Sequence, residues 1–95
     1  MIKEKYLRQI KSLVSETAKN QKIKVFIFGS SIKEKKFGDI DVGISGKIDD
    51  TTINKLKESF EDSTLPYFVD VINFNKASKD FKNNVMDQKI LWIKR

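Results

Sequence analysis

The sequence predicts an α/β (α+β) fold in which a small mixed β-sheet is flanked by helices. Three segments rich in β-branched and aromatic residues, 23–28, 39–45 and 67–74, have the length and composition of strands. Segments with helical spacing precede, separate and follow them, an alternation typical of a sheet covered by helices. A chain of 95 residues has room for one hydrophobic core, so residues 1–95 are expected to form a single domain.

The first two helices are predicted from the spacing of apolar side chains. Residues 2–19 carry them three and four positions apart, the pattern of an amphipathic helix. The predicted stripe is Ile2, Tyr6, Ile10, Leu13 and Thr17. A second helix is predicted over residues 51–62, capped by Asp49 or Asp50. Its buried residues would be Ile53, Leu56 and Phe60.

The C-terminal part of the sequence predicts one more helix and leaves one alternative open. A helix over residues 78–88 would bury Phe81 and Val85. The segment ILWIK that follows fits either a helix or a strand. The expected order of elements is α-β-α-β-α-β-α.

The first predicted strand leads into a turn that is suited to phosphate binding. Residues 23–28 are almost continuously apolar, which predicts burial on both faces. Gly29 would let a phosphate approach the backbone, and Ser30 could donate to it and cap a short helix. In the loop that follows, Lys33 is positioned to meet a triphosphate, with Lys35 and Lys36 nearby.

Composition excludes several kinds of chemistry and favours others. The absence of cysteine and histidine excludes thiolate nucleophiles, Ser-His-Asp triads and zinc sites built on these residues. A metal would need oxygen ligands, as Mg²⁺ and Mn²⁺ do. The net charge of +6 favours anionic partners. No apolar run approaches the roughly 18 residues of a membrane span, and no signal peptide is evident, so a cytoplasmic protein is expected.

Three acidic residues lie inside the predicted strands. Asp39 and Asp41 alternate with apolar residues, so their carboxylates share one face of a strand. Asp70 lies in the middle of another strand. Because unpaired carboxylates in an apolar setting are unfavourable, a divalent cation held by all three would remove both repulsion and desolvation. One or two Mg²⁺ ions held in this way support phosphoryl and nucleotidyl transfer.

The combined pattern resembles a known family. The sequence reads FGS at 28–30, DIDVG at 39–43 and VDV at 69–71. It is similar to the minimal nucleotidyltransferase (MNT) proteins of the DNA polymerase β-like superfamily, over about residues 24–90. The loop departs from the family pattern: only eight residues separate Ser30 from Asp39, and Ser31 and Lys33 occupy the usual arginine positions.

The resemblance implies a polymerase β-like fold and assigns roles to individual residues. Gly29 and Ser30 would bind the phosphates of ATP. Asp39 and Asp41 would ligate Mg²⁺, with Mn²⁺ as the other candidate, and Asp70 would be the third catalytic carboxylate.

The resemblance also implies a partner, because MNT proteins are typically encoded beside a small helical HEPN-domain protein. In one version the MNT protein is an antitoxin that transfers AMP from ATP to a tyrosine of a HEPN toxin. In another, the helical protein is the substrate-binding subunit of a small-molecule nucleotidyltransferase. Either version predicts a hetero-oligomer, because the catalytic sheet uses almost the whole chain and something else must present the acceptor.

Two readings without catalysis compete with these. The shortened loop favours a module that neutralises its partner by binding alone. The positive charge favours a nucleic-acid binder, but the lysines are scattered and no recognition motif is present, so nucleic acid is the weaker expectation.

Overall fold

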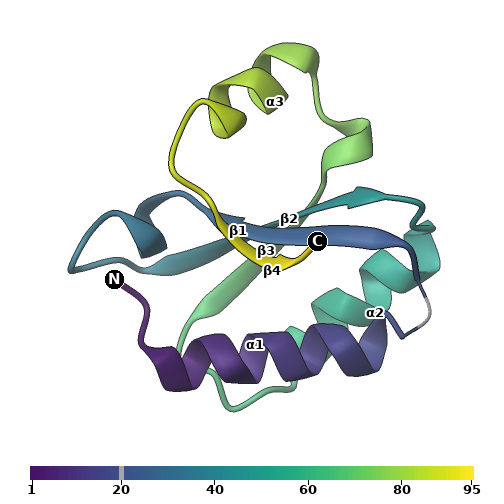
Figure 1. Ribbon diagram of the computed structural model, residues 1–95. Coiled ribbons are helices and arrows are strands. Elements are labelled where there is room, and N and C mark those ends of the chain that lie inside the picture. Colours follow the sequence, from purple (N-terminus) through teal and green to yellow (C-terminus); the bar gives the residue numbers. More distant parts are fainter. Residues whose placement is uncertain (20) are drawn as a thin grey trace.

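Four strands form one mixed sheet in the order β3-β2-β1-β4 (Figure 1). The computed structural model describes residues 1–19 and 21–95. Strand β1 runs antiparallel to both β2 and β4, whereas β2 and β3 are parallel. In chain order the elements are α1 (Glu4–Thr17), β1 (Ile23–Phe28), the short 3₁₀ helix η1 (Ser30–Ile32), β2 (Asp39–Gly46), α2 (Asp50–Glu61), β3 (Phe68–Asn73), a second 3₁₀ helix η2 (Phe74–Lys76), α3 (Lys79–Met86) and β4 (Leu91–Lys94).

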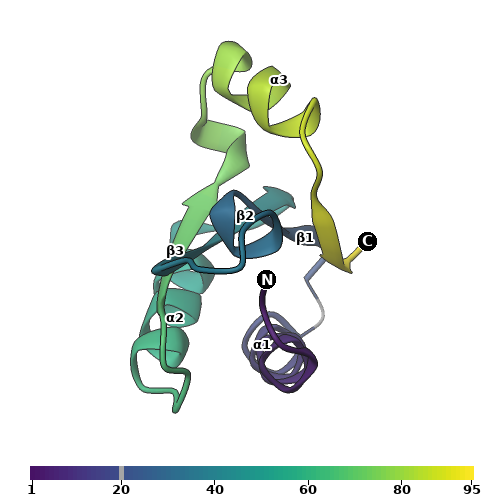
Figure 2. The ribbon, with the colours of Figure 1, turned by 90° about the vertical axis from the view of Figure 1, so that its left-hand side faces the viewer.

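The sheet separates two hydrophobic clusters. Figure 2 shows α1 and α2 below the sheet and α3 above it. Below, Val25 and Ile27 of β1 belong to a large cluster with residues of α1, α2, β2 and β3. Above, Phe26 and Phe28 pack with Phe74 and with Val85 of α3. Strand β1 is therefore buried on both faces, as its apolar sequence predicts.

Helix α1 is shorter than predicted, and its buried stripe differs from the predicted one. It begins at Glu4 because the residues before it lie against η1, where the Ile2 N–H donates to the Ser31 carbonyl at 2.9 Å. Val14, which the predicted stripe omits, is fully packed against the sheet, whereas Leu13 is half-buried. The apolar face is therefore rotated by about one residue at the end of the helix.

Helix α2 confirms its prediction. Asp49 is the cap, and its side chain accepts a hydrogen bond from the Thr52 N–H at 2.8 Å. The predicted residues Ile53, Leu56 and Phe60 are all buried. The helix ends at Glu61, close to the predicted boundary.

The C-terminal elements correct one prediction and decide an open alternative. Phe81 of α3 is 39% exposed, so its predicted burial is wrong, although its ring contacts the rings of Phe28 and Phe74 at the edge of the upper cluster. The predicted helix over 78–88 is present as α3, and the ILWIK segment after it is extended and forms β4, which decides between its two alternatives. The segment is a strand and not a helix because it pairs with the otherwise open edge of β1.

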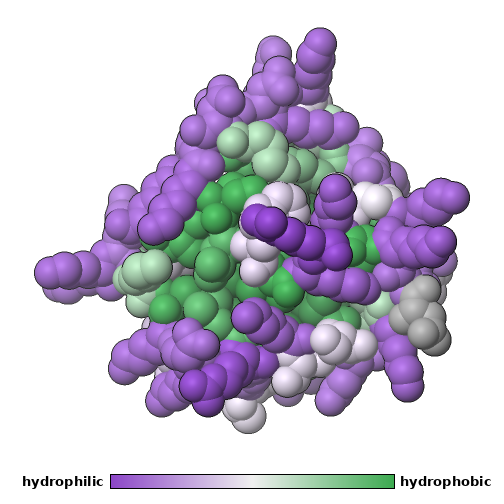
Figure 3. Space-filling model, in the orientation of Figure 1, coloured by the Kyte–Doolittle hydropathy of each residue, from purple (hydrophilic) through white to green (hydrophobic). Residues whose placement is uncertain are grey.

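Figure 3, drawn in the orientation of Figure 1, shows apolar side chains gathered above α1 and around the position of β4. In β4, the side chains of Leu91, Trp92 and Ile93 are half-buried. Within the described part of the chain, no helix has the length and apolar character to cross a membrane.

Candidate active site

The three predicted aspartates lie on one face of the sheet, in the first halves of two parallel strands. Asp41 of β2 is the direct register partner of Asp70 of β3, and Asp39 lies two positions before Asp41. Neighbouring strands are about 4.8 Å apart, and positions i and i+2 of a strand are about 7 Å apart with side chains on the same face. The alternation arises because Ile40 and Val42 are completely buried below the sheet, which turns the aspartates upward.

The aspartates are adjacent in register but do not form a closed ligand cluster. Asp39 and Asp70 are exposed, and Asp41 is half-buried. Across residues 1–19 and 21–95, no three carboxyl groups converge closely enough to hold an ion. The fold therefore places the three aspartates at neighbouring strand positions, but their carboxyl groups do not converge on one point.

Gly29 brings the predicted phosphate-binding turn against one of these carboxylates. Its φ of +85° is in a region that L side chains rarely adopt. A Cβ atom at this position would lie 2.6 Å from Asp41 Oδ2, so the Asp41 carboxylate would have to move to accommodate a side chain. The backbone conformation therefore requires glycine, and the closeness of the two residues means that Gly29 and Asp41 belong to one site.

Ser30 follows Gly29 as the first residue of η1 and is half-buried. Gly29, not Ser30, is the cap residue, and no side-chain capping bond is formed, so the predicted capping role of Ser30 is wrong.

The electrostatics of the site centre on Asp41. Burial raises the pKa of the Asp41 carboxyl, and the negative charges of Asp70 and Asp39 raise this pKa further. Without a cation, these surroundings favour the protonated, neutral form of Asp41. A cation beside the carboxyl would favour the ionised form instead. Oxygen donors of this kind suit Mg²⁺ or Mn²⁺, so the residues present fit such an ion chemically.

The two positions where the family usually has arginines, Ser31 and Lys33, lie inside η1 and directly after it. Ser31 is fully buried, and its hydroxyl has no hydrogen-bond partner within the described residues. A fully buried serine position has no space for the longer side chain of an arginine. Lys33 lies in the predicted loop, but its ammonium donates a short hydrogen bond to Gln88 Oε1, just beyond α3.

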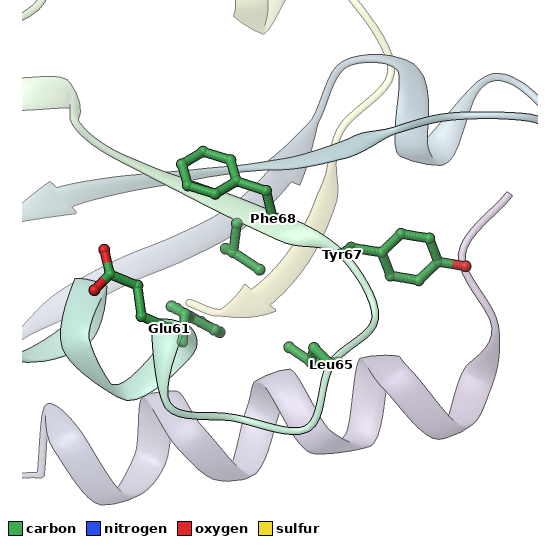
Figure 4. A pocket seen from close by; sticks show the side chains of 6 residues that line it. Glu61, Leu65, Tyr67 and Phe68 are labelled. Carbon is green, nitrogen blue, oxygen red and sulfur yellow. The ribbon is translucent and has the colours of Figure 1, made fainter.

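The sequence reasoning missed a pocket at the β3 edge of the sheet, on the side that α2 covers. It has a volume of about 250 Å³ and lies between the end of α2 and the start of β3 (Figure 4). Its lining residues are Phe60, Glu61, Leu65, Tyr67, Phe68 and Val69. Phe68 is 60% exposed and is the register partner of Asp39. The orientation of Phe68 could have been predicted from the sequence, because a strand that turns Asp70 upward also turns Phe68 upward.

A larger hollow of about 420 Å³ lies at the opposite end of the sheet and contains none of the predicted site residues. Four of its lining residues are basic: Lys22, Lys24, Lys94 and Arg95.

Comparison with known proteins decides the family. The sequence model of the family described as "Polymerase beta, Nucleotidyltransferase" matches residues 8–95, nearly the whole chain. The chain belongs to the polymerase β nucleotidyltransferase family. Within this family it is similar to the "Probable protein adenylyltransferase MntA" of Haemophilus influenzae, with 32% identity over 85 residues. The match covers 85% of this chain and 73% of that protein.

A solved structure confirms the nucleotidyltransferase fold. The chain resembles a chain in the crystal structure of a mutant form of the toxin–antitoxin pair MntA-HpeT, with a TM-score of 0.68 and 21% identity. The alignment covers 90% of this chain and 71% of that one. The predicted resemblance to minimal nucleotidyltransferases and the predicted mixed sheet flanked by helices are both confirmed.

Proposed function

We propose that this nucleotidyltransferase transfers AMP from ATP, with Mg²⁺, to a hydroxyl group presented by a partner protein. We further propose that it is the MNT antitoxin of a HEPN/MNT toxin–antitoxin pair and acts in the cytoplasm. The similarity to a protein named as an adenylyltransferase supports the reaction. The resemblance to a chain of a toxin–antitoxin pair supports the biological setting and a hetero-oligomer with a helical HEPN protein.

The observation that carries the proposal is the contact between the Gly29 turn and Asp41, beside Asp70. A backbone turn suited to phosphate lies directly against a carboxylate that has two further carboxylates as neighbours. A phosphate and three carboxylates repel one another unless a cation lies between them. The site therefore makes chemical sense as a place where metal and nucleotide bind together.

The proposed roles follow from position. The backbone at Gly29 and the Ser30 hydroxyl would hold the phosphates, and Lys33 would leave Gln88 to meet the triphosphate. Asp39, Asp41 and Asp70 would hold Mg²⁺, which when bound supplies charge neutralisation for the phosphates.

The bond changes are those of nucleotidyl transfer. The acceptor hydroxyl oxygen forms a bond to the α-phosphorus of ATP, and the bond from this phosphorus to the bridging oxygen of the β-phosphate breaks. Pyrophosphate leaves with that electron pair, and Asp70 is the proposed acceptor of the hydroxyl proton.

The first prediction tests this reaction directly. The chain is incubated with α-³²P-labelled ATP, Mg²⁺ and the product of its neighbouring gene, and transfer of label to protein is measured. Replacement of both ligands (Asp39→Asn with Asp41→Asn) is expected to reduce transfer by at least about a hundredfold, because each carboxylate removed weakens the metal site. Label transfer that persists in this folded double variant would refute the metal-dependent mechanism.

Two further functions give different outcomes in the same experiment. Label found on a small molecule only in the presence of the partner would identify the chain as the catalytic subunit of a two-protein small-molecule nucleotidyltransferase. The bond between Lys33 and Gln88 favours a third function, an antitoxin that acts by binding alone. That function predicts that the double variant still protects cells from the partner and that the unaltered chain does not bind ATP.

A further inference from the structure

We propose that the exposed ring of Phe81 is the surface on which the base of the bound nucleotide stacks. The base would lie against Phe81 while the phosphates lie at Gly29 and Asp41. The inference rests on the proposed function and extends it, because it assigns a residue to the one part of ATP for which the phosphate and metal ligands do not account.

The first argument is the position of the upper aromatic cluster, which adjoins the aspartates. Phe28 is the register partner of Asp41 in the antiparallel pair of β1 and β2. Both side chains are on the upper face of the sheet, because Phe28 belongs to the upper cluster and Asp41 alternates with residues buried below. Directly opposed side chains have Cβ atoms about 4.5–5.5 Å apart. Aromatic surface therefore begins on the strand next to Asp41.

A glycine lets the same cluster extend over β2. A Cβ atom at Gly43 would overlap the Phe26 ring, so this ring lies directly over the backbone of the strand. Gly43 is two positions after Asp41, about 7 Å along the strand. Aromatic rings thus border Asp41 from two sides, and a nucleotide whose phosphates lie at Asp41 has these rings next to it.

The second argument is that one ring of this region is both supported and exposed. Helix α3 lies above the sheet (Figure 2), and the centroid of the Phe81 ring is 6.2 Å from that of Phe28 and 5.7 Å from that of Phe74. The three phenylalanines of the upper cluster are at most 7% exposed, whereas Phe81 is 39% exposed. The packed rings hold Phe81 in position, and its exposed part is free to stack with a flat aromatic ligand.

The third argument is that α3 is joined to the predicted phosphate loop. Lys33, directly after η1, donates a hydrogen bond to Gln88, just beyond the end of α3. The helix that carries Phe81 therefore lies beside the loop proposed to hold the triphosphate. A nucleotide needs a polar site for its phosphates and cation and an aromatic surface for its uncharged base, and this face of the sheet has both.

The exposed ring of Phe68 is the rival stacking surface. Phe68 is the register partner of Asp39, but it lies on β3, an edge of the sheet. The Gly29 turn approaches Asp41 from the opposite side, where it follows β1. A nucleotide held by this turn therefore lies nearer to the rings of the upper cluster than to Phe68.

The test separates binding of the base from binding of the phosphates. Calorimetric titrations in the presence of Mg²⁺ use a non-hydrolysable ATP analogue and, in parallel, tripolyphosphate, which has the phosphates without the base. Phe81→Leu is expected to weaken binding of the ATP analogue at least about fivefold, because the stacking of a base on an aromatic ring is lost. Binding of tripolyphosphate should change less than about twofold, because the phosphate and metal ligands are intact.

Two further variants are matched controls. Phe81→Tyr keeps an aromatic ring at the position and is expected to bind the ATP analogue within about twofold of the unaltered chain. Phe68→Leu makes the same substitution at the rival ring and is expected to change neither titration by more than about twofold. Circular dichroism checks that all three variants are folded.

Several results would overturn the proposal while leaving the proposed function in place. These are unchanged binding of the ATP analogue by Phe81→Leu, equal weakening of both ligands by this variant, and loss of analogue binding in Phe68→Leu instead. Weaker binding of the neighbouring gene product by Phe81→Leu without ATP would assign the ring to a protein interface and would also overturn it.

The remaining results concern the proposed function. If the unaltered chain binds neither the ATP analogue nor tripolyphosphate, the proposed function fails and the stacking surface fails with it. If the chain binds the analogue through Phe81 but transfers no label to an acceptor, the proposed reaction fails and the stacking surface remains.

Discussion

Asp41 carries a charge that its protein surroundings do not neutralise. Burial raises its pKa in the folded state, and the charges of Asp70 and Asp39 raise it further. A carboxyl whose folded pKa is raised contributes stability in its protonated form. This contribution is complete below the unfolded pKa of about 3.8 and is lost as the pH rises through the folded pKa. At neutral pH the ionised residue therefore destabilises the fold.

The second prediction follows from this sign. Asp41→Asn replaces the ionised carboxylate with a neutral side chain of similar size, so the variant is expected to be more stable than the unaltered chain at pH 7. Urea unfolding measured at pH 7 and pH 3 checks it, because the difference should nearly vanish at pH 3, where the carboxyl is protonated in both states. Added Mg²⁺ should raise the unfolding midpoint of the unaltered chain only.

The expectation fails if Asp41→Asn lowers the stability at pH 7. That result would mean that the carboxylate forms a favourable contact in solution, such as a bound cation retained from the cell.

At the scale of elements, the turn from β1 into η1 joins the sheet to the proposed phosphate site. The turn depends on Gly29, which has a φ of +85° and lies in contact with the Asp41 carboxylate. The same loop contains Gly38, whose added Cβ would meet nothing within 4 Å. Substitution is therefore expected to be unfavourable at Gly29 and tolerated at Gly38, in the same connection between β1 and β2.

The third prediction compares these glycines. Gly29→Ala is expected to lower the free energy of unfolding by about 1–3 kcal/mol, because it adds backbone strain and a steric clash. Gly38→Ala should be within about 0.5 kcal/mol of the unaltered chain. In the double variant Gly29→Ala with Asp41→Gly, the clash is absent but the strained φ remains, so only part of the loss should be recovered. Chemical denaturation measures all three, and full recovery would contradict the backbone argument.

The elements that the sequence predicts well are those whose side-chain pattern is local. Strands β1 and β2 and helix α2 follow from apolar runs, alternation and a cap, and the positions of Asp39, Asp41 and Asp70 follow with them. Tertiary contacts decide the rest. The early residues of the chain bind η1 instead of extending α1, and β4 is a strand because β1 has an open edge. Likewise, only the packing of α3 determines that Phe81 lies at the edge of its cluster.

At the scale of the whole molecule, Lys33 and Gln88 connect distant parts of the chain across the upper face of the sheet. The bond joins the loop before β2 to the segment after α3, 55 residues later. The sequence could suggest Lys33 as a phosphate ligand, but it could not reveal a competing partner so far away. If ATP recruits Lys33, the nucleotide must first displace Gln88.

The fourth prediction tests this competition. Gln88→Ala is expected to increase the affinity for ATP about twofold to tenfold, because one neutral hydrogen bond no longer has to be broken. Lys33→Ala should decrease that affinity, and Lys35→Ala, in the same loop, serves as the control. Calorimetric titration with a non-hydrolysable ATP analogue and Mg²⁺ measures each. Equal weakening by Gln88→Ala and Lys33→Ala would instead mean that Gln88 holds Lys33 in its binding position.

The pairing of β4 with β1 has a consequence for how the chain emerges from the ribosome. Phe26 and Trp92 are register partners, so one edge of the apolar strand β1 stays open until the end of this sequence is translated. At about 5–20 residues per second, that interval lasts several seconds, during which the open edge can pair with another chain. The strand that finally covers it is short and carries Lys94, features that discourage further pairing. A chain released before β4 would contain every aspartate of the site and still be prone to aggregation.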